Sequence, residues 1–189
     1  MTESADLKVL AEFVEILEVL GIKYAIGGSI ASSVYGEIRF TQDADVAVEP
    51  FADKAEKFYK EVKSSFYVGK AAMYEALGNR KSFNIIHLAS AFKIDIFIRK
   101  DAEFDKQVLD RRRLIKLDES IERSFSVVSP EDIVLHKLKW YREGGCSSER
   151  QWQDILGVLR IQKGELDAEY LKKWAITLGV DGLLDKAQI

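Results

Sequence analysis

Residues 24–49 of the chain read YAIGGSIASSVYGEIRFTQDADVAVE, and this stretch decides the fold. A short apolar run, 22–26, is typical of a buried strand. The triplet Gly-Gly-Ser at 27–29 ends that run, and residues 30–35 have the pattern of a helix. A second apolar run, 44–48, favours another strand. The stretch therefore predicts a strand, a glycine turn, a helix and a second strand.

The glycine turn suits the binding of phosphate. Glycines let a ligand approach the backbone closely, and the free N–H groups at a helix start favour an anion. Gly28 and Ser29 are the residues that we expect to hold it, with the Ser29 hydroxyl as a further donor. The alternative is an ordinary turn, which is what a Gly-Gly-Ser sequence after a strand usually forms.

Two aspartates open the second strand. Side chains in a strand alternate between its two faces, so Asp43 and Asp45 point the same way. Two adjacent carboxylates repel each other unless positive charge lies between them, and Mg²⁺ prefers carboxylate and phosphate oxygens. The alternative for Asp-x-Asp is a solvated turn or a helix cap.

A third aspartate lies inside a strongly apolar strand. Asp95 interrupts the sequence FKIDIFI at 92–98, where a charge is costly unless it is paired or bound to metal. If that strand lies beside residues 44–48, the three carboxylates complete a site for two Mg²⁺ ions. The alternative is an edge-strand charge, or a partner of Lys93 or Arg99.

The rest of the chain divides into a mixed part and a helical part. We expect further helices at 5–20, 51–65 and 101–113, and further strands at 82–88, 92–98 and 124–128. Ser129-Pro130-Glu131-Asp132 is a helix start, and helices are predicted at 131–143, 149–162, 167–178 and 180–187. The fold class is α+β: a core at 1–128 with a small mixed sheet flanked by helices, and a helical region at 129–189 packed on it.

Composition excludes several classes of protein. The chain has 47% hydrophobic and 31% charged residues, which is typical of a globular protein, and its net charge of -3 gives no overall attraction to nucleic acid. Cys146 is the only cysteine, so no internal disulfide forms. No apolar run approaches the ~20 residues that span a bilayer. We expect a cytoplasmic protein without a membrane partner.

Four other features have both a functional and a structural interpretation. His87 and His136 are too few for a zinc site and favour packing, although His136 could line a cleft. The basic residues 111–113 favour a solvated helix end or, alternatively, contact with RNA phosphates. Trp140 and Tyr141 favour packing between helices, and stacking on a base is the alternative.

The order Gly28-Ser29, Asp43-x-Asp45 and then Asp95 resembles the nucleotidyltransferase superfamily with the DNA polymerase β-like fold. The likeness covers about residues 20–100 and includes the approach Arg39-Phe40-Thr41-x-Asp43. The tail, with Lys137 on one helix and Asp154 on the next, resembles the abortive-infection type toxin nucleotidyltransferases and their uncharacterised relatives.

This resemblance implies transfer of a nucleoside monophosphate from a triphosphate such as ATP to a hydroxyl or phosphate. Two Mg²⁺ ions are implied, with Asp43, Asp45 and Asp95 as ligands and Asp95 also deprotonating the acceptor. Gly28, Ser29, Arg39 and Asp154 are implied to bind the nucleotide. Lys137 is implied to neutralise phosphate charge.

The acceptor remains open between RNA, a protein and a small molecule such as an antibiotic. The resemblance to toxins adds a cognate antitoxin as a candidate partner. A different class of function also fits the sequence: a non-catalytic module that keeps the fold and binds a nucleotide or a partner. The complete set of three acids favours the enzyme.

Overall fold

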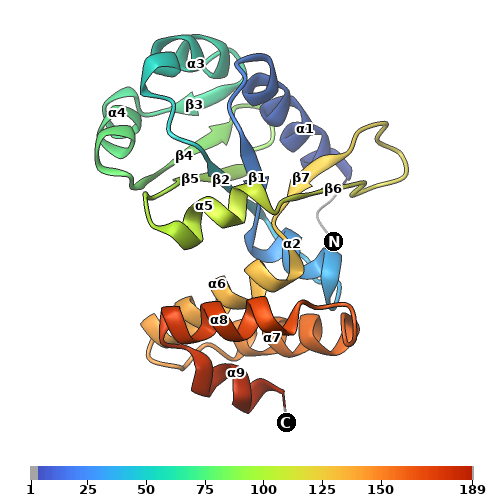
Figure 1. Cartoon of the computed structure of the whole chain (residues 1–189). Helices are drawn as coiled ribbons and strands as arrows, with labels where there is room; N and C mark the ends of the chain where they lie inside the picture. The colour runs from blue at the N-terminus through green and yellow to red at the C-terminus, as the bar shows by residue number, and fades with distance from the viewer. Residues whose placement is uncertain (1–3, 189) are drawn as a thin grey trace.

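A mixed β-sheet forms the framework of the N-terminal part (Figure 1). The structure is a computed structural model and describes residues 4–188. The strands are β1 (Tyr24–Ile26), β2 (Asp43–Val48), β3 (Phe66–Val68), β4 (Ser82–His87), β5 (Lys93–Ile98), β6 (Arg113–Ile115) and β7 (Phe125–Val127). Their order across the 7-stranded sheet is β3-β4-β5-β2-β1-β7-β6. The predicted mixed sheet is therefore confirmed, with β2 at its centre.

The pairing of β2 with β5 decides where the aspartates lie. The two strands run parallel, and Asp45 lies opposite Asp95 in the register. The hairpin of β4 and β5 places Asn84 on the other side of Asp95. Because residues opposite each other in a sheet share a face, Asp45 and Asp95 point to the same side. The predicted neighbourhood of the two strands is confirmed.

The two faces of the sheet differ in burial. Ala44, Val46 and Val48 of β2 are fully buried, whereas the alternate residues of the strand are partly exposed. Aromatic rings fill the buried side: Phe13 and Phe58 meet edge to face with ring centroids 6.3 Å apart. The burial of so much apolar surface stabilises the sheet and leaves its opposite face available for polar residues.

The helices surround this sheet and continue beyond it. They are α1 (Ser4–Val19), α2 (Gly28–Tyr35), η1 (Ala52–Lys54), α3 (Ala55–Val62), α4 (Lys70–Asn79), α5 (Glu103–Asp110), α6 (Pro130–Glu143), α7 (Glu149–Ile161), α8 (Ala168–Leu178) and α9 (Asp181–Ala187). In the described part of the chain, no helix combines the length and the apolar character needed to cross a membrane.

The C-terminal helices α6 to α9 stack as a separate layer next to the sheet, with α2 between them and the strands (Figure 1). Helix α6 begins as the sequence predicts. The Ser129 hydroxyl accepts a hydrogen bond from the Asp132 N–H at 3.2 Å, and Pro130 occupies the first turn. Helix α2 contacts both α6 and α7, so it joins the sheet to the C-terminal layer.

Two parts of the core differ from the expectation. The predicted helix 101–113 is too long: α5 ends at Asp110, and Arg113 belongs to β6. Arg111 and Arg113 keep contact with solvent, but each also pairs with the buried carboxylate of Glu131, at 3.1 and 3.6 Å. Burying a carboxylate is costly without a cation beside it, and these ion pairs explain why the segment after α5 packs against Glu131.

The second difference concerns β3 and α4, for which we had no prediction. The three residues of β3 pair with β4 at the edge of the sheet. A strand of three residues is too short to show a recognisable alternation of polar and apolar residues. Its stability comes from pairing with the neighbouring strand, which the local sequence does not show.

Candidate functional site

Asp43, Asp45 and Asp95 lie on the partly exposed face of β2 and β5. Two of these carboxylates are held by neighbours from the same chain segment. The Thr41 hydroxyl donates to Asp43 Oδ1 at 2.8 Å, and the Lys93 ammonium donates to Asp95 Oδ2 at 2.7 Å. We call these three aspartates the acid cluster. The structure therefore brings together all three of the predicted acids.

The charge of the acid cluster is incompletely neutralised. The pKa of Asp45 is raised to about 6, first because the carboxyl group is buried and second because Asp43 and Asp95 repel a further negative charge. Lys137 and Lys93 lower this pKa, but their effect is smaller. Asp45 thus lies at a position where an additional positive charge would be strongly favoured.

The glycine turn lies directly against Asp45. The Gly27 N–H donates to the Asp45 carbonyl at 2.8 Å. Gly28 has a φ of +54°, and a Cβ atom at this position would lie 1.7 Å from Asp45 Oδ2. Only glycine avoids both the strained backbone and this collision. The start of α2 and the acid cluster are therefore in immediate contact, which the spacing in the sequence does not reveal.

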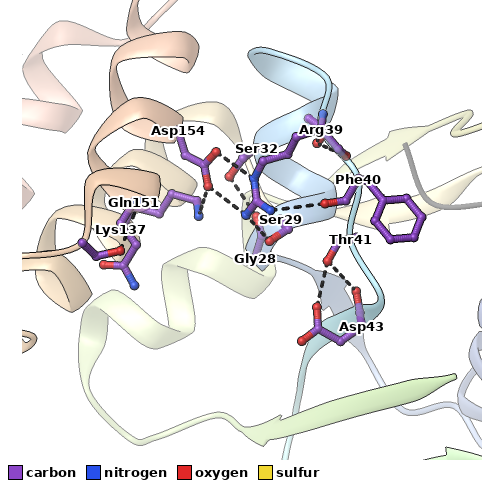
Figure 2. A network of polar contacts seen from close by, with 12 residues as sticks. Gly28, Ser29, Ser32, Arg39, Phe40, Thr41, Asp43, Lys137, Gln151 and Asp154 are labelled. Carbon is purple, nitrogen blue, oxygen red and sulfur yellow. Dashed lines mark hydrogen bonds and ion pairs between the residues drawn. The ribbon is translucent and has the colours of Figure 1, made fainter. Parts of the chain in front are cut away.

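Arg39, Lys137 and Asp154 form a second group of charges (Figure 2). Arg39 donates from Nε and Nη2 to the two oxygens of Asp154, at 2.9 and 3.0 Å. Lys137 Nζ donates to Asp154 Oδ2 at 2.7 Å. Arg39 Nη2 also donates to the Ser29 hydroxyl at the start of α2. We call Arg39, Lys137 and Asp154 the basic cluster. Through these residues and Ser29 it connects α2, the link to β2, α6 and α7.

The basic cluster carries a surplus of positive charge. One carboxylate, Asp154, is shared by two cations, and all but a small part of the Lys137 and Asp154 side chains is buried. Burial lowers the pKa of Lys137, and its hydrogen bond to Asp154 opposes this effect. Asp154 therefore fixes the two cations in place without neutralising both.

A pocket of about 670 Å³ connects the two clusters. Its lining includes Gly28, Ser29, Arg39, Asp43, Asp45 and Lys137. We call it the first pocket. Figure 2 shows the basic cluster and the start of α2 on one side and Asp43 with Thr41 on the other. A ligand that carries both anionic groups and a cation matches this separation of charge.

The carboxylates suit a hard divalent cation, but they are not arranged to hold one as they stand. Oxygen donors, burial and the raised pKa of Asp45 all favour an ion such as Mg²⁺. Within residues 4–188, however, no group of three or more His, Cys, Asp or Glu side chains is placed to bind a metal ion. Asp95 Oδ2 accepts a hydrogen bond from Lys93, so this ion pair competes with a metal ion for the Asp95 carboxylate.

Further residues of the first pocket were not predicted. They include Phe40, Arg150 and Gln151. The Oε1 atom of Gln151 is buried, and no hydrogen-bond partner for it exists among the described residues. Arg150 lies four residues before Asp154 on α7, and this spacing is the only signal for it in the sequence. Gln151 lies at an ordinary helix position, and only the packing of α7 brings it to the pocket.

The two histidines have structural surroundings. His87 Nδ1 is 2.8 Å from the Ser90 hydroxyl, and its ring packs on Phe66, as expected. His136 packs between Phe104 and Trp140. Burial lowers the pKa of His136 to about 4, so its ring is neutral at pH 7.

No model of a known protein family matches the sequence, and no curated protein matches it. Solved structures do match. An antigenic nucleotidyltransferase-like protein from Paracoccidioides brasiliensis aligns with a TM-score of 0.58 at 18% identity, covering 99% of this chain and 94% of that one. The antibiotic-resistance factor ANT(2″)-Ia aligns with a TM-score of 0.60 at 11% identity, covering 97% and 96%.

A third similar structure is the lincosamide antibiotic adenylyltransferase LnuA, solved with lincomycin, with a TM-score of 0.50 at 13% identity and coverage of 85% and 98%. ANT(2″)-Ia has also been solved with adenylyl-2″-tobramycin. At these identities the likeness shows the fold alone. The chain has the α+β fold of nucleotidyltransferase-like proteins, as its sequence predicts.

Proposed function

We propose that this chain is a magnesium-dependent nucleotidyltransferase that moves a nucleoside monophosphate from a triphosphate to a hydroxyl group. The observation that carries the proposal is the first pocket, where Asp43 and Asp45 face the start of α2 and the basic cluster. A triphosphate bound to a divalent cation has the same separation of charge. The fold shared with nucleotidyltransferase-like proteins supports this function.

The phosphates are assigned to the side of the pocket that carries positive charge. The first N–H groups of α2 have no partner within the helix, and the helix dipole favours an anion there. Ser29, Arg39 and Lys137 surround this helix start. Arg39 and Lys137 stabilise the charge that develops on the phosphates during transfer. Asp154 acts through these two cations by holding them in position.

Asp43, Asp45 and Asp95 would hold the metal ion, with the Lys93 ammonium competing for the Asp95 carboxylate. When bound, Mg²⁺ neutralises phosphate charge and lowers the pKa of the attacking hydroxyl. The acceptor oxygen forms a bond to the α-phosphorus, and the bond from that phosphorus to the bridging oxygen breaks. Pyrophosphate leaves with the electron pair, and a carboxylate oxygen of Asp95 takes the hydroxyl proton.

A non-catalytic nucleotide-binding module is the second candidate. The ion pair between Lys93 and Asp95 favours it, because it occupies the third carboxylate with a cation from the chain itself. A role as a toxin with a cognate antitoxin is supported only by the sequence pattern around Lys137 and Asp154. The order of preference is therefore the enzyme first and the binding module second.

The test is transfer of labelled nucleoside monophosphate from each of the four common triphosphates, with Mg²⁺, to RNA, protein and antibiotic acceptors. We expect a labelled product with at least one acceptor. We also expect Asp45→Asn to lower the rate by about 10³-fold or more, since it removes a central charge of the site. Asp53→Asn is the matched control, because Asp53 is an exposed acid remote from the pocket.

Two results would contradict the enzyme. One is the absence of transfer and of triphosphate consumption with every acceptor. The other is a low rate that is equal in the parent protein and in Asp45→Asn, which would point to a contaminating activity. Calorimetric binding of a triphosphate without any turnover would favour the binding module.

A further inference from the structure

A second pocket adjoins the first one at Asp45. Its volume is about 470 Å³, and it shares Gly28, Asp45, Phe97 and Trp140 with the first pocket. It extends from there over the end of β5 towards α5. A molecule in this second pocket would therefore have one end at the acid cluster. That is the position required of the group that receives the nucleotide.

The walls of the second pocket can accommodate a flat ring. Phe97 is 37% exposed, an unusual state for a large apolar side chain within a central strand. Trp140 from α6 and Val108 and Leu109 from α5 supply further apolar surface. Aromatic side chains that are exposed in a pocket are suited to stacking against the ring of a ligand.

The rim of the second pocket is basic. Five cationic residues line it, against the two acids Asp45 and Asp105. The cationic residues are Arg80, Lys81, Arg99, Lys100 and Lys139. Arg80 and Arg99 lie 3.7 and 3.9 Å from Asp101, but that side chain is 70% exposed and neutralises them weakly. The rim therefore attracts anions.

Arg80 provides an independent sign that a ligand belongs here. It ends α4 with a φ of +52°, a left-handed conformation that favours glycine or asparagine over arginine. Its Nη1 atom is buried, and nothing within residues 4–188 accepts a hydrogen bond from it. A strained backbone and an unpaired buried donor both cost stability. The helix end accounts for the backbone conformation, and an anion in the pocket would give Nη1 a partner.

We propose that the second pocket binds the acceptor and that this acceptor is a nucleotide, either free or at the end of an RNA chain. The identification of this ligand as the acceptor rests on the proposed function. The ring stacks against Phe97 and Trp140, a phosphate meets Arg80 and the neighbouring cations, and a ribose hydroxyl lies at the Asp45 end. A polycationic aminoglycoside such as tobramycin is disfavoured, because the basic rim repels its ammonium groups.

The experiment measures ligand binding separately from turnover. The first pocket is filled with α,β-methylene-ATP and Mg²⁺. Fluorescence anisotropy then follows a ten-nucleotide single-stranded RNA that has a 5′ dye and a free 3′ hydroxyl, with AMP and tobramycin as competitors. The variants are Arg80→Gly and the double change Lys100→Glu with Lys139→Glu. The matched control is Lys57→Glu with Lys163→Glu, which reverses two exposed cations away from the pocket.

We expect both pocket variants to raise the Kd for the RNA about tenfold, the effect of one lost charged contact. The control should change it less than twofold. The thermal midpoint of Arg80→Gly should not fall, because glycine relieves the left-handed backbone. Competition by AMP would indicate a free nucleotide as a sufficient ligand, whereas competition by longer RNA alone would indicate an RNA end.

Equal losses in the control and pocket variants would overturn the proposal, since they would show general attraction to RNA. A higher affinity for tobramycin in the parent protein than in the charge-reversed variant would overturn it as well. If RNA binds as expected but no acceptor is ever modified, the enzyme activity fails and the ligand class of the pocket stands. The two proposals can therefore fail separately.

Discussion

Two groups of acids in this molecule, one partly exposed and one buried, have opposite surroundings. One is the acid cluster of Asp43, Asp45 and Asp95, and the other is the pair Glu131 and Asp132 at the start of α6. Both groups place carboxylates where solvation is incomplete. Burial and the charges of Asp43 and Asp95 raise the pKa of Asp45 to about 6, whereas the pKa of Glu131 lies below its usual value.

The reason for this difference is the supply of partners. Burial alone would raise the pKa of Glu131, but hydrogen bonds from the Asp167 N–H at 3.1 Å, from its own N–H and from Ser129, together with the charge of Arg113, outweigh it. Asp132 accepts from the Ser129 and Tyr170 hydroxyls, at 2.8 and 2.7 Å. Burial nevertheless raises the pKa of Asp132. The chain itself supplies the hydrogen-bond donors and cations for this pair, and these contacts connect α6 to the end of α5 and to α8.

In the acid cluster, the direct ion pair among the described residues is that of Lys93 with Asp95, and the charge of Lys137 acts on Asp45 without an ion pair. Neutralised buried acids stabilise a fold, and acids that lack cations reduce its stability unless a ligand completes them. The comparison therefore separates acids that hold the fold together from acids that the fold reserves for binding.

The largest effect on stability should follow from Arg111→Met, which removes the cation between Glu131 and Asp132. We expect a loss of about 3 kcal/mol at pH 7, because two buried carboxylates lose a cation that they share. The thermal midpoint should fall by roughly 6–12 °C for a chain of this size. The deficit should shrink below about pH 4, where these carboxylates become protonated.

The matched control is Arg160→Met, since Arg160 pairs with Glu37 on the surface, where both side chains are more than half exposed. We expect its loss to stay below about 1 kcal/mol. A loss in Arg111→Met as small as in this control would mean that the pair at α6 does not need its cation.

Asp45→Asn should act in the opposite direction. The pKa of Asp45 is higher in the folded protein than in the unfolded chain, so its ionisation reduces stability as the pH rises from about 4 to about 6. Removing that charge should stabilise the metal-free protein by about 1 kcal/mol at pH 8, allowing for partial exposure, and by almost nothing at pH 4.

Differential scanning calorimetry in a chelator at both pH values measures this effect, with Asp53→Asn as the exposed control. Added Mg²⁺ should stabilise the parent protein and leave Asp45→Asn unchanged. If the metal-free variant is less stable than the parent at pH 8, groups within the chain already stabilise the charged form of Asp45.

The smallest effect should come from Lys93→Met, which frees Asp95 from its only ion pair among the described residues. An ion pair as exposed as this one contributes less than about 1 kcal/mol, so the affinity for Mg²⁺ should rise about two- to fivefold. Isothermal titration measures the change, and Lys57→Met is the control. A weaker affinity would mean that Lys93 supports the metal site instead of competing with it.

Much of the fold was predictable because its signals are local. The apolar runs at 44–48 and 92–98 and the cap at Ser129 lead directly to β2, β5 and α6. The edge strands β3 and β6 were missed or misread because three residues carry no reliable period. Arg111 was misread for a similar reason, since its partner Glu131 lies 20 residues later in the chain.

For the candidate site, the sequence by itself determined which chemical groups are present and which of them share a strand face. Alternation alone places Asp43 and Asp45 together. Tertiary structure decided the rest: the register that sets Asp95 opposite Asp45, the approach of Gly28 to Asp45, and the meeting of Arg39 with Lys137 at Asp154. The physical reason is that spacing fixes directions only within one element. Contacts between elements depend on how sheets pair and helices pack.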